Sequence, residues 1–279
     1  MTNQTCLTIR TPSGLSGDML VAGLAAIFGA DRKNLPKIIR LIGLPELKGS
    51  ASLLRERRGG IVGWRLIVRI GDTAHHRDLR KIERLITASS LTPGAKKMAL
   101  SAFRILARAE SSVHDIPASR VEFHEVGALD SVLDILAACF FFDRLGAGRL
   151  VCSPLPVCDG VAQSAHGPLM TPAPAVLEML TGVPVFGVPS TGETVTPTAI
   201  ALLKAFGAEF GPWPSMVVTR TARVFGSRTL PGIPNGAIFA LGTPYVQGKP
   251  SPRESSDRRL KSGHHGDHDH HAARKSPKA

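Results

Sequence analysis

The sequence predicts an α/β protein, a layered mixed sheet with covering helices, followed by a disordered His-rich tail. β-prone runs alternate with apolar runs at helical spacing through most of the 279 residues, which indicates layered strands and helices. Hydrophobic residues make up 43% of the chain, enough for a sizeable core. After about residue 245 the composition changes to Pro, Ser, Lys, Arg and His, which cannot bury enough apolar surface to fold. We therefore expect a body over residues 1–245 and a tail over residues 246–279.

The first half of the body is expected to open on a strand and to continue as helices on either side of a hairpin. The alternating, β-prone run TCLTIR predicts the first strand, and the turn TPSGLSGDM connects it to an apolar helix. Gly59 and Gly60 lie between two β-prone runs and predict a hairpin turn. In chain order, the expected elements are a strand over 5–10, helices over 20–28 and 34–43, hairpin strands over 51–58 and 61–70, and helices near 77–89 and 94–113.

The second half is expected to follow a loop over 119–131 and to interleave helices with strands. The apolar run VLDILAACFFFDRL predicts a buried helix that Gly146 and Gly148 end. A segment rich in Gly and Pro, residues 159–175, leads into the next helix through Pro172 and Pro174. In chain order, the expected elements are a helix over 132–145, a strand over 149–157, a helix over 175–182, a strand over 183–188, a helix over 197–206, and strands over 216–226 and 235–242.

The formal net charge of +12 suggests nucleic acid at first sight, but its distribution does not favour that partner. Eight Lys or Arg and four Asp or Glu from Lys249 onward give the tail +4, and the rest is spread over the body with a cluster at Arg55, Arg57 and Arg58. Two Trp and one Tyr provide few stacking platforms for bases. A basic surface also attracts small molecules that carry phosphate, which we consider the better match.

The chain shows no signal for a membrane or for secretion. No apolar run approaches the length of a bilayer span, and the N-terminal residues MTNQTCLTIR lack a basic region before an apolar stretch. We therefore expect a cytoplasmic protein with reduced thiols. Cys6 and Cys139 are expected to pack as small hydrophobes. Cys152 and Cys158 lie six residues apart, which leaves open a thiolate site for a soft metal or inert packing.

The tail carries the strongest compositional signal for metal. The run HHGDHDHH, residues 264–271, holds five of the ten histidines, and imidazole suits nickel, zinc and copper while carboxylates add oxygen donors. A cloning tag is disfavoured because the histidines are interrupted and eight residues follow them. We predict metal ligation in the tail by His264, His265, His268, His270, His271, Asp267 and Asp269.

Five segments of the body carry further candidates, each with a structural alternative. The loop FHEVGALDS places His124, Glu125 and Asp130 within seven residues, suited to metal ligation or acid–base chemistry, although Asp130 could cap a helix that starts near Ser131. In AHHRDL, His76 is the candidate, and Asp78 could cap the next helix.

The other three segments are two loops that contain Gly and Pro and a glycine-containing turn. His166 and Glu193 could bind a ligand or only brace the turns SAHGPLMTPAPA and GETVTPTA. The turn GLSGDM, with Ser16, Gly17 and Asp18, resembles an anion-binding turn but lacks the lysine of a P-loop, and its glycines could serve only the backbone path.

Taken together, the order of these segments resembles the LarC family. The resemblance rests on SGLSGDM, HHRDL, VEFHEVGALDSVLDILA, SPLPV, AHGPLMTPAPAVLEMLTG and ETVTPTAIALL, covers roughly residues 5–242, and is followed by a His-rich region such as the family also carries. It implies a nickel insertase that places nickel between the two sulfurs of pyridinium-3,5-bisthiocarboxylic acid mononucleotide, with a carbon–metal bond, in biosynthesis of the nickel-pincer cofactor. It also implies CTP hydrolysis with Mn²⁺ or Mg²⁺, and a product that serves lactate racemase and related enzymes.

The resemblance assigns roles to the candidate residues. The implied catalytic set is His124, Glu125, Asp130, His166 and Glu193, and the implied cofactor-binding set is Ser16, Gly17, Asp18 and His76. We further expect the loops that carry His124 and His166 to converge at one site.

The chain also departs from the family pattern. It has Arg10 and Thr11 where the family usually has Asp, and HHRDL differs from the usual His-Arg-His order. Family members normally continue into a second domain that binds CTP, so chelatase (cyclometallase, lyase class) activity is expected to need that domain as a separate partner. The alternatives are a metal buffer without catalysis, a nucleotide-dependent hydrolase and a nucleic-acid binder, and a homo-oligomer is also left open.

Overall fold

The computed structural model describes residues 5–44, 49–70, 77–123, 128–164, 167–230 and 232–245. Apart from Tyr245, these residues belong to the unit Met1–Pro244. The helices are α1 (Gly17–Phe28), α2 (Leu35–Arg40), α3 (Leu79–Ala88), α4 (Pro93–His114), the 3₁₀ turn η1 (Ala118–Arg120), α5 (Leu129–Leu145), α6 (Pro174–Leu180) and α7 (Pro197–Ala205). The strands are β1 (Cys6–Arg10), β2 (Gly49–Arg58), β3 (Ile61–Ile70), β4 (Arg77–Asp78), β5 (Glu122–Phe123), β6 (Arg149–Cys152), β7 (Leu155–Val157), β8 (Gly160–Ser164), β9 (Gly167–Thr171), β10 (Val185–Gly187), β11 (Glu209–Phe210), β12 (Met216–Val224) and β13 (Ala237–Pro244).

The predicted α/β class with a layered mixed sheet is confirmed. A seven-stranded sheet has the order β11-β6-β1-β13-β12-β3-β2. Strand β1 runs parallel to β6 and antiparallel to β13, and β12 pairs antiparallel with β13 and parallel with β3. The hairpin β2–β3 is also confirmed, with Arg58 opposite Ile61 across the turn. Strands β1 and β13, the first and the last of the body, are neighbours in the middle of this sheet.

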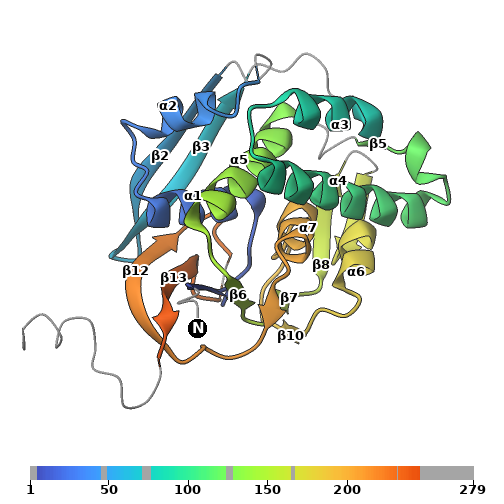
Figure 1. The fold of residues 1–279 in the computed structure, drawn as a ribbon. Helices are drawn as coiled ribbons and strands as arrows, with labels where there is room; N and C mark the ends of the chain where they lie inside the picture. The colour runs from blue at the N-terminus through green and yellow to red at the C-terminus, as the bar shows by residue number, and fades with distance from the viewer. Residues whose placement is uncertain are drawn as a thin grey trace, which may run out of the picture. The chain divides into compact units, whose positions relative to one another are not determined.

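Helices cover the sheet in layers (Figure 1). Helix α1 contacts β3, β12 and β13 and also packs against α5, so it is buried between the sheet and a second helix. Helix α4 contacts α5, α6 and α7 and forms a further layer over them. This central position explains why α1 and α5 are apolar on most sides rather than amphipathic. At the contact with the sheet, Gly23 of α1 faces the ring of Phe239, where a Cβ would lie 2.5 Å from a ring carbon.

Local sequence signals account for several helix ends. The Asp78 side chain accepts a hydrogen bond from the backbone N–H of Lys81 at 2.7 Å, as expected for a cap of α3. Thr196 caps α7 in the same way, and Pro197 occupies the first turn. Helix α1 ends at Gly29, which has a positive φ of 99°. Helices α1 and α5 begin three residues before their predicted starts, and α2 is shorter than predicted.

Two predictions about strands were wrong or incomplete. Residues 149–157 form two strands in different sheets, because the chain changes partners between Cys152 and Leu155. The N–H of Ser153 still donates to Ile9 of the large sheet, at 3.0 Å, whereas the N–H of Leu155 donates to Pro184, at 2.9 Å. Pro154 between them has no N–H to donate. The Gly- and Pro-rich segment contains the hairpin β8–β9, which the sequence did not predict.

The expectations about a membrane span and about the tail stand differently. Among the described residues, no helix is both long and apolar enough to cross a bilayer. The predicted disordered tail lies outside the described residues, so its disorder stays a prediction.

Candidate functional site

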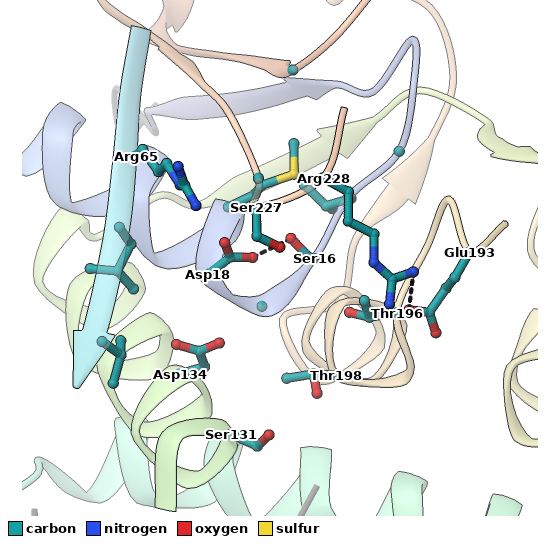
Figure 2. Close-up of a pocket in the computed structure, with 18 of the residues that line it drawn as sticks. Ser16, Asp18, Arg65, Ser131, Asp134, Glu193, Thr196, Thr198, Ser227 and Arg228 are labelled. Atoms are coloured by element: carbon teal, nitrogen blue, oxygen red, sulfur yellow. Dashed lines mark hydrogen bonds and ion pairs between the residues drawn. The ribbon is translucent and has the colours of Figure 1, made fainter. Parts of the chain in front are cut away.

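A pocket of about 680 Å³ opens where the turns before α1, α5 and α7 come together (Figure 2). Its walls are completed by residues 65–69 of β3 and by the segment that joins β12 to β13. All five candidates that the structure describes line it, namely Ser16, Gly17, Asp18, Asp130 and Glu193. These residues come from three segments far apart in the sequence, so the fold brings together residues that the sequence could only name separately.

Two loops are joined side by side at one wall of the pocket. The backbone N–H of Leu15 donates to the carbonyl of Thr194 at 3.0 Å, and the N–H of Thr196 donates back to the carbonyl of Leu15 at 3.1 Å. Gly14 makes this approach sterically feasible, because it has a φ of 135° and a Cβ there would lie 2.0 Å from the Thr194 carbonyl oxygen. Gly14 is therefore required by the local backbone conformation and by its close contact with Thr194, as the structural interpretation of this turn proposed. Glu193 is positioned by the same pair of loops.

Asp18 occupies the N-terminus of α1. Its carboxylate accepts hydrogen bonds from the Ser16 hydroxyl and from the backbone N–H groups of Asp18 and Met19. Burial nevertheless raises the pKa of the Asp18 carboxyl above its ordinary value, against the opposing effect of these hydrogen bonds and of Arg65. The Asp18 carboxylate thus already accepts hydrogen bonds from N–H groups at this helix end. A phosphate would need the same N–H groups, so the turn is poorly suited to the anion binding that its sequence suggested.

Asp134 is a pocket residue that the sequence analysis did not single out. Its Oδ1 is inaccessible to solvent and has no hydrogen-bond partner within the described part of the chain, although the residue as a whole is partly exposed. Burial first, and then the carboxylates of Asp18 and Asp130, raise the pKa of the Asp134 carboxyl well above its ordinary value. A signal existed in the sequence, because Asp130 and Asp134 are four residues apart and share one face of α5.

Asp130 lies in the first turn of α5 and does not cap it as proposed, because the helix begins at Leu129 with Ala128 at the N-cap. The Asp130 carboxylate accepts a hydrogen bond from the N–H of Ser131 at 2.7 Å. Its side chain is exposed at the pocket, which leaves it accessible to a ligand.

Arginines form a basic rim, defined here as Arg65, Arg69 and Arg228, and none of them was predicted. Arg228 lies 3.7 Å from the Glu193 carboxylate, and Arg65 donates to Glu56 at 3.0 Å. Figure 2 shows Arg65 and Arg228 on opposite sides of the pocket, with Asp18 between them.

The loop that carries Arg228 is anchored by the arginine cluster noted in the sequence. Arg58 of β2 donates to the carbonyls of Gly226 at 2.7 Å and Arg228 at 3.0 Å. At least this member of the cluster therefore supports the pocket rather than forming a separate nucleic-acid surface.

The remaining candidates cannot be placed. His76, His124, Glu125, His166 and the tail residues 264–271 lie outside the described residues. Their roles, and the expected convergence of the loops that carry His124 and His166, stay predictions. Among the residues that the structure does describe, no three His, Cys, Asp or Glu side chains lie close enough together to enclose a metal ion.

The cysteines behave as packing residues. All four are free and buried, and Cys152 and Cys158 lie on separate segments rather than on one strand face. Burial raises the pKa of the Cys152 thiol to about 12 and raises that of Cys139 further still. The Cys158 thiol donates to the Gly192 carbonyl at 2.9 Å. A metal binds the thiolate, so these raised pKa values disfavour a thiolate site.

We therefore expect the native thiols to resist alkylation by iodoacetamide at pH 8. For Cys152, a pKa near 12 lowers the thiolate population about a thousandfold relative to an ordinary thiol. Mass spectrometry after timed labelling should show little modification of the native chain and modification of all four cysteines after denaturation. Rapid labelling of native Cys152 or Cys158 would contradict the packing interpretation.

Comparisons with known proteins agree with one another. The chain matches the family model described as "Nickel insertion protein" over residues 7–262. It is 39% identical over 232 residues to a putative nickel insertion protein of Pelobacter propionicus, covering 83% of this chain and 59% of that protein. It is 37% identical over 239 residues to a protein of a Nocardioides species named pyridinium-3,5-bisthiocarboxylic acid mononucleotide nickel insertion protein, covering 85% of this chain and 59% of that protein. The chain thus spans about three fifths of the length of these relatives, and no solved structure matches it.

Proposed function

The chain belongs to the nickel insertion protein family, and from this we propose that it binds Ni²⁺ and delivers it to pyridinium-3,5-bisthiocarboxylic acid mononucleotide in its central pocket. The observation that carries the proposal is the convergence of Ser16, Gly17, Asp18, Asp130 and Glu193 on one pocket. The substrate comes from the name of the Nocardioides relative.

The chemistry of the pocket supports a substrate of this kind. A volume of about 680 Å³ is in the usual range for a small-molecule site. The arginines of the basic rim suit the phosphate of a mononucleotide, since guanidinium groups donate paired hydrogen bonds to phosphate oxygens. The exposed carboxylate of Asp130, which also lines the pocket, suits the positive pyridinium ring. A ligand with a cationic ring at one end and a phosphate at the other would match this separation of charge.

Nickel is treated as the cargo, and the proposed route begins in the tail. We propose that the histidines and aspartates of residues 264–271 collect Ni²⁺ from a cytoplasmic pool. Asp130 and Glu193 are proposed to act on the bound precursor. His124, Glu125 and His166 are proposed to complete the same site, with His76 assisting in binding. CTP with Mn²⁺ or Mg²⁺ is proposed to act through a second domain of the kind that the family resemblance implies.

A nucleotide-dependent hydrolase remains a weaker candidate. The turn GLSGDM lacks a P-loop lysine, and Asp18 takes N–H groups that a phosphate would need. A metal buffer would need only the tail and would leave the pocket without a role.

Reconstitution separates these functions. The full chain is titrated calorimetrically with the purified precursor, and nickel insertion is then followed by mass spectrometry with Ni²⁺, CTP and Mg²⁺, with and without the second domain of a longer relative. We expect the chain alone to bind the precursor, to hydrolyse CTP at no more than background rate, and to insert nickel only with the second domain present. Absence of precursor binding would refute the proposed pocket function and favour the metal buffer. Robust CTP turnover by the chain alone would favour the hydrolase.

A further inference from the structure

Carboxylates gather at the inner end of the pocket. We call Asp18 and Asp134 the carboxylate floor, and Asp130 lies one turn before Asp134 on α5. Within the described part of the chain, the charged neighbours that raise the pKa of the Asp134 carboxyl are themselves carboxylates, Asp18 and Asp130. Figure 2 shows Asp18 and Asp134 on neighbouring elements, lining the same side of the pocket. Like charges gathered in a poorly solvated place are stable only if they bind protons or a cation.

The arginines around the pocket do not supply that cation. The guanidinium of Arg65 pairs with Glu56 at 3.0 Å, and that of Arg228 lies 3.7 Å from Glu193. Arg65 exerts an electrostatic effect on Asp18 but contributes no such effect to Asp134. The Oδ1 atom of Asp134 is thus buried with neither a hydrogen-bond donor nor an ion-pair partner within the described residues.

The space beside Asp134 is also kept open. A Cβ on Gly17 would lie 2.9 Å from Asp134 Oδ2 and 2.9 Å from a methyl carbon of Thr198. Any side chain at position 17 would thus cover the second oxygen of this carboxylate. Glycine at this helix position carries a conformational cost, and here it leaves Asp134 accessible from the side of α1.

From these observations we infer that Asp18 and Asp134 hold a hard divalent cation, Mg²⁺ or Mn²⁺, at the floor of the pocket. Carboxylate and hydroxyl oxygens, which the described pocket lining offers, suit these ions. Mg²⁺ commonly binds through one or two carboxylates and keeps several waters, so a cluster of three protein ligands is unnecessary. The remaining positions would be filled by water or by oxygens of the bound substrate. This cation is distinct from the nickel cargo and does not depend on nickel insertion.

The test uses Mn²⁺ alone on the full chain, since free Mn²⁺ is counted directly by its electron paramagnetic resonance signal. Asp134→Asn and Asp18→Asn remove the charge with little change in shape. Asp115→Asn is the matched control, because Asp115 is an exposed carboxylate at the end of α4 and does not line the pocket. All variants keep the tail, so binding by the tail is the same in each.

We expect wild type and Asp115→Asn to bind one more Mn²⁺ per chain than either pocket variant. Saturating Mn²⁺ should raise the thermal midpoint of wild type and Asp115→Asn by roughly 5–10 °C and leave that of Asp134→Asn unchanged. The thermal curves also show whether each variant is folded. Equal Mn²⁺ stoichiometry and an equal midpoint shift in wild type and Asp134→Asn would overturn the inference. Such a result would leave precursor binding, and with it the proposed function, to be judged by its own titration.

Discussion

Gly14→Ala is expected to destabilise the body and separate the two loops that form one wall of the pocket. Its new Cβ would lie 2.0 Å from the Thr194 carbonyl oxygen, and this backbone atom cannot be moved by a side-chain rotation. The φ of 135° adds backbone strain for any residue with a Cβ. Backbone strain costs about 1–3 kcal/mol and overpacking costs about 1–3 kcal/mol, so the thermal midpoint should fall by roughly 5–15 °C.

Gly29→Ala provides the control that separates strain from steric clash. Gly29 also has a positive φ, 99°, but a methyl group added there would meet no atom within 4 Å, so only the strain applies. Thermal unfolding of the three proteins, wild type included, is followed by circular dichroism. We expect Gly14→Ala to lose about twice as much stability as Gly29→Ala. Equal midpoints for the two variants would show that the contact between Gly14 and Thr194 does not constrain the pocket wall.

Truncation of the chain after Gly248 is expected to remove most of its Ni²⁺ binding. The removed segment contains His264, His265, His268, His270 and His271 together with Asp267 and Asp269. Equilibrium dialysis at pH 7.5 should therefore show several Ni²⁺ ions per full chain and a large loss in the truncated chain. A matched variant of full length, with the five histidines replaced by asparagine, should lose nickel to a similar extent, whereas Asp267→Asn with Asp269→Asn should lose much less.

The same binding should fall as the pH is lowered. An imidazole ligates a metal only when it is neutral, so protonation at about pH 6–6.5 competes with Ni²⁺ and releases it. Dialysis of the full chain at pH 7.5 and pH 5.5 measures this loss. Full nickel stoichiometry in the truncated chain would refute the role of the tail and would move the search for the nickel ligands to the body.

Patterns of short range in the sequence were sufficient for most of the fold. The alternation in TCLTIR, the Gly59-Gly60 turn and the helical spacing of apolar residues each reflect interactions within a few residues. The cap Asp78 was readable for the same reason, because the capping side chain accepts a hydrogen bond from an N–H three residues later. The hairpin β8–β9 was not predicted from the sequence, because its strands are short and lie in a segment rich in Gly and Pro.

The site was determined only in part by the sequence. Motifs and family resemblance identified Ser16, Gly17, Asp18, Asp130 and Glu193, but not that these five residues line a single pocket. The basic rim went unnoticed because Arg65, Arg69 and Arg228 lie in strands and loops without any local pattern that distinguishes them from other surface arginines.

What the sequence by itself determined was the α/β class, most helices and strands, and the residue types capable of metal and phosphate chemistry. Only the tertiary structure decided that Gly14 lies against Thr194, 180 residues away in the chain, and that Asp134 lies near enough to Asp18 for the two carboxylates to interact. The physical reason is that a helix or turn is specified by neighbours in the sequence, whereas the pKa of a carboxyl group depends on burial and on charges from distant segments. Asp134 looks like an ordinary helix residue until the packing of α1 against α5 buries its Oδ1 and adds the carboxylate of Asp18 to that of Asp130.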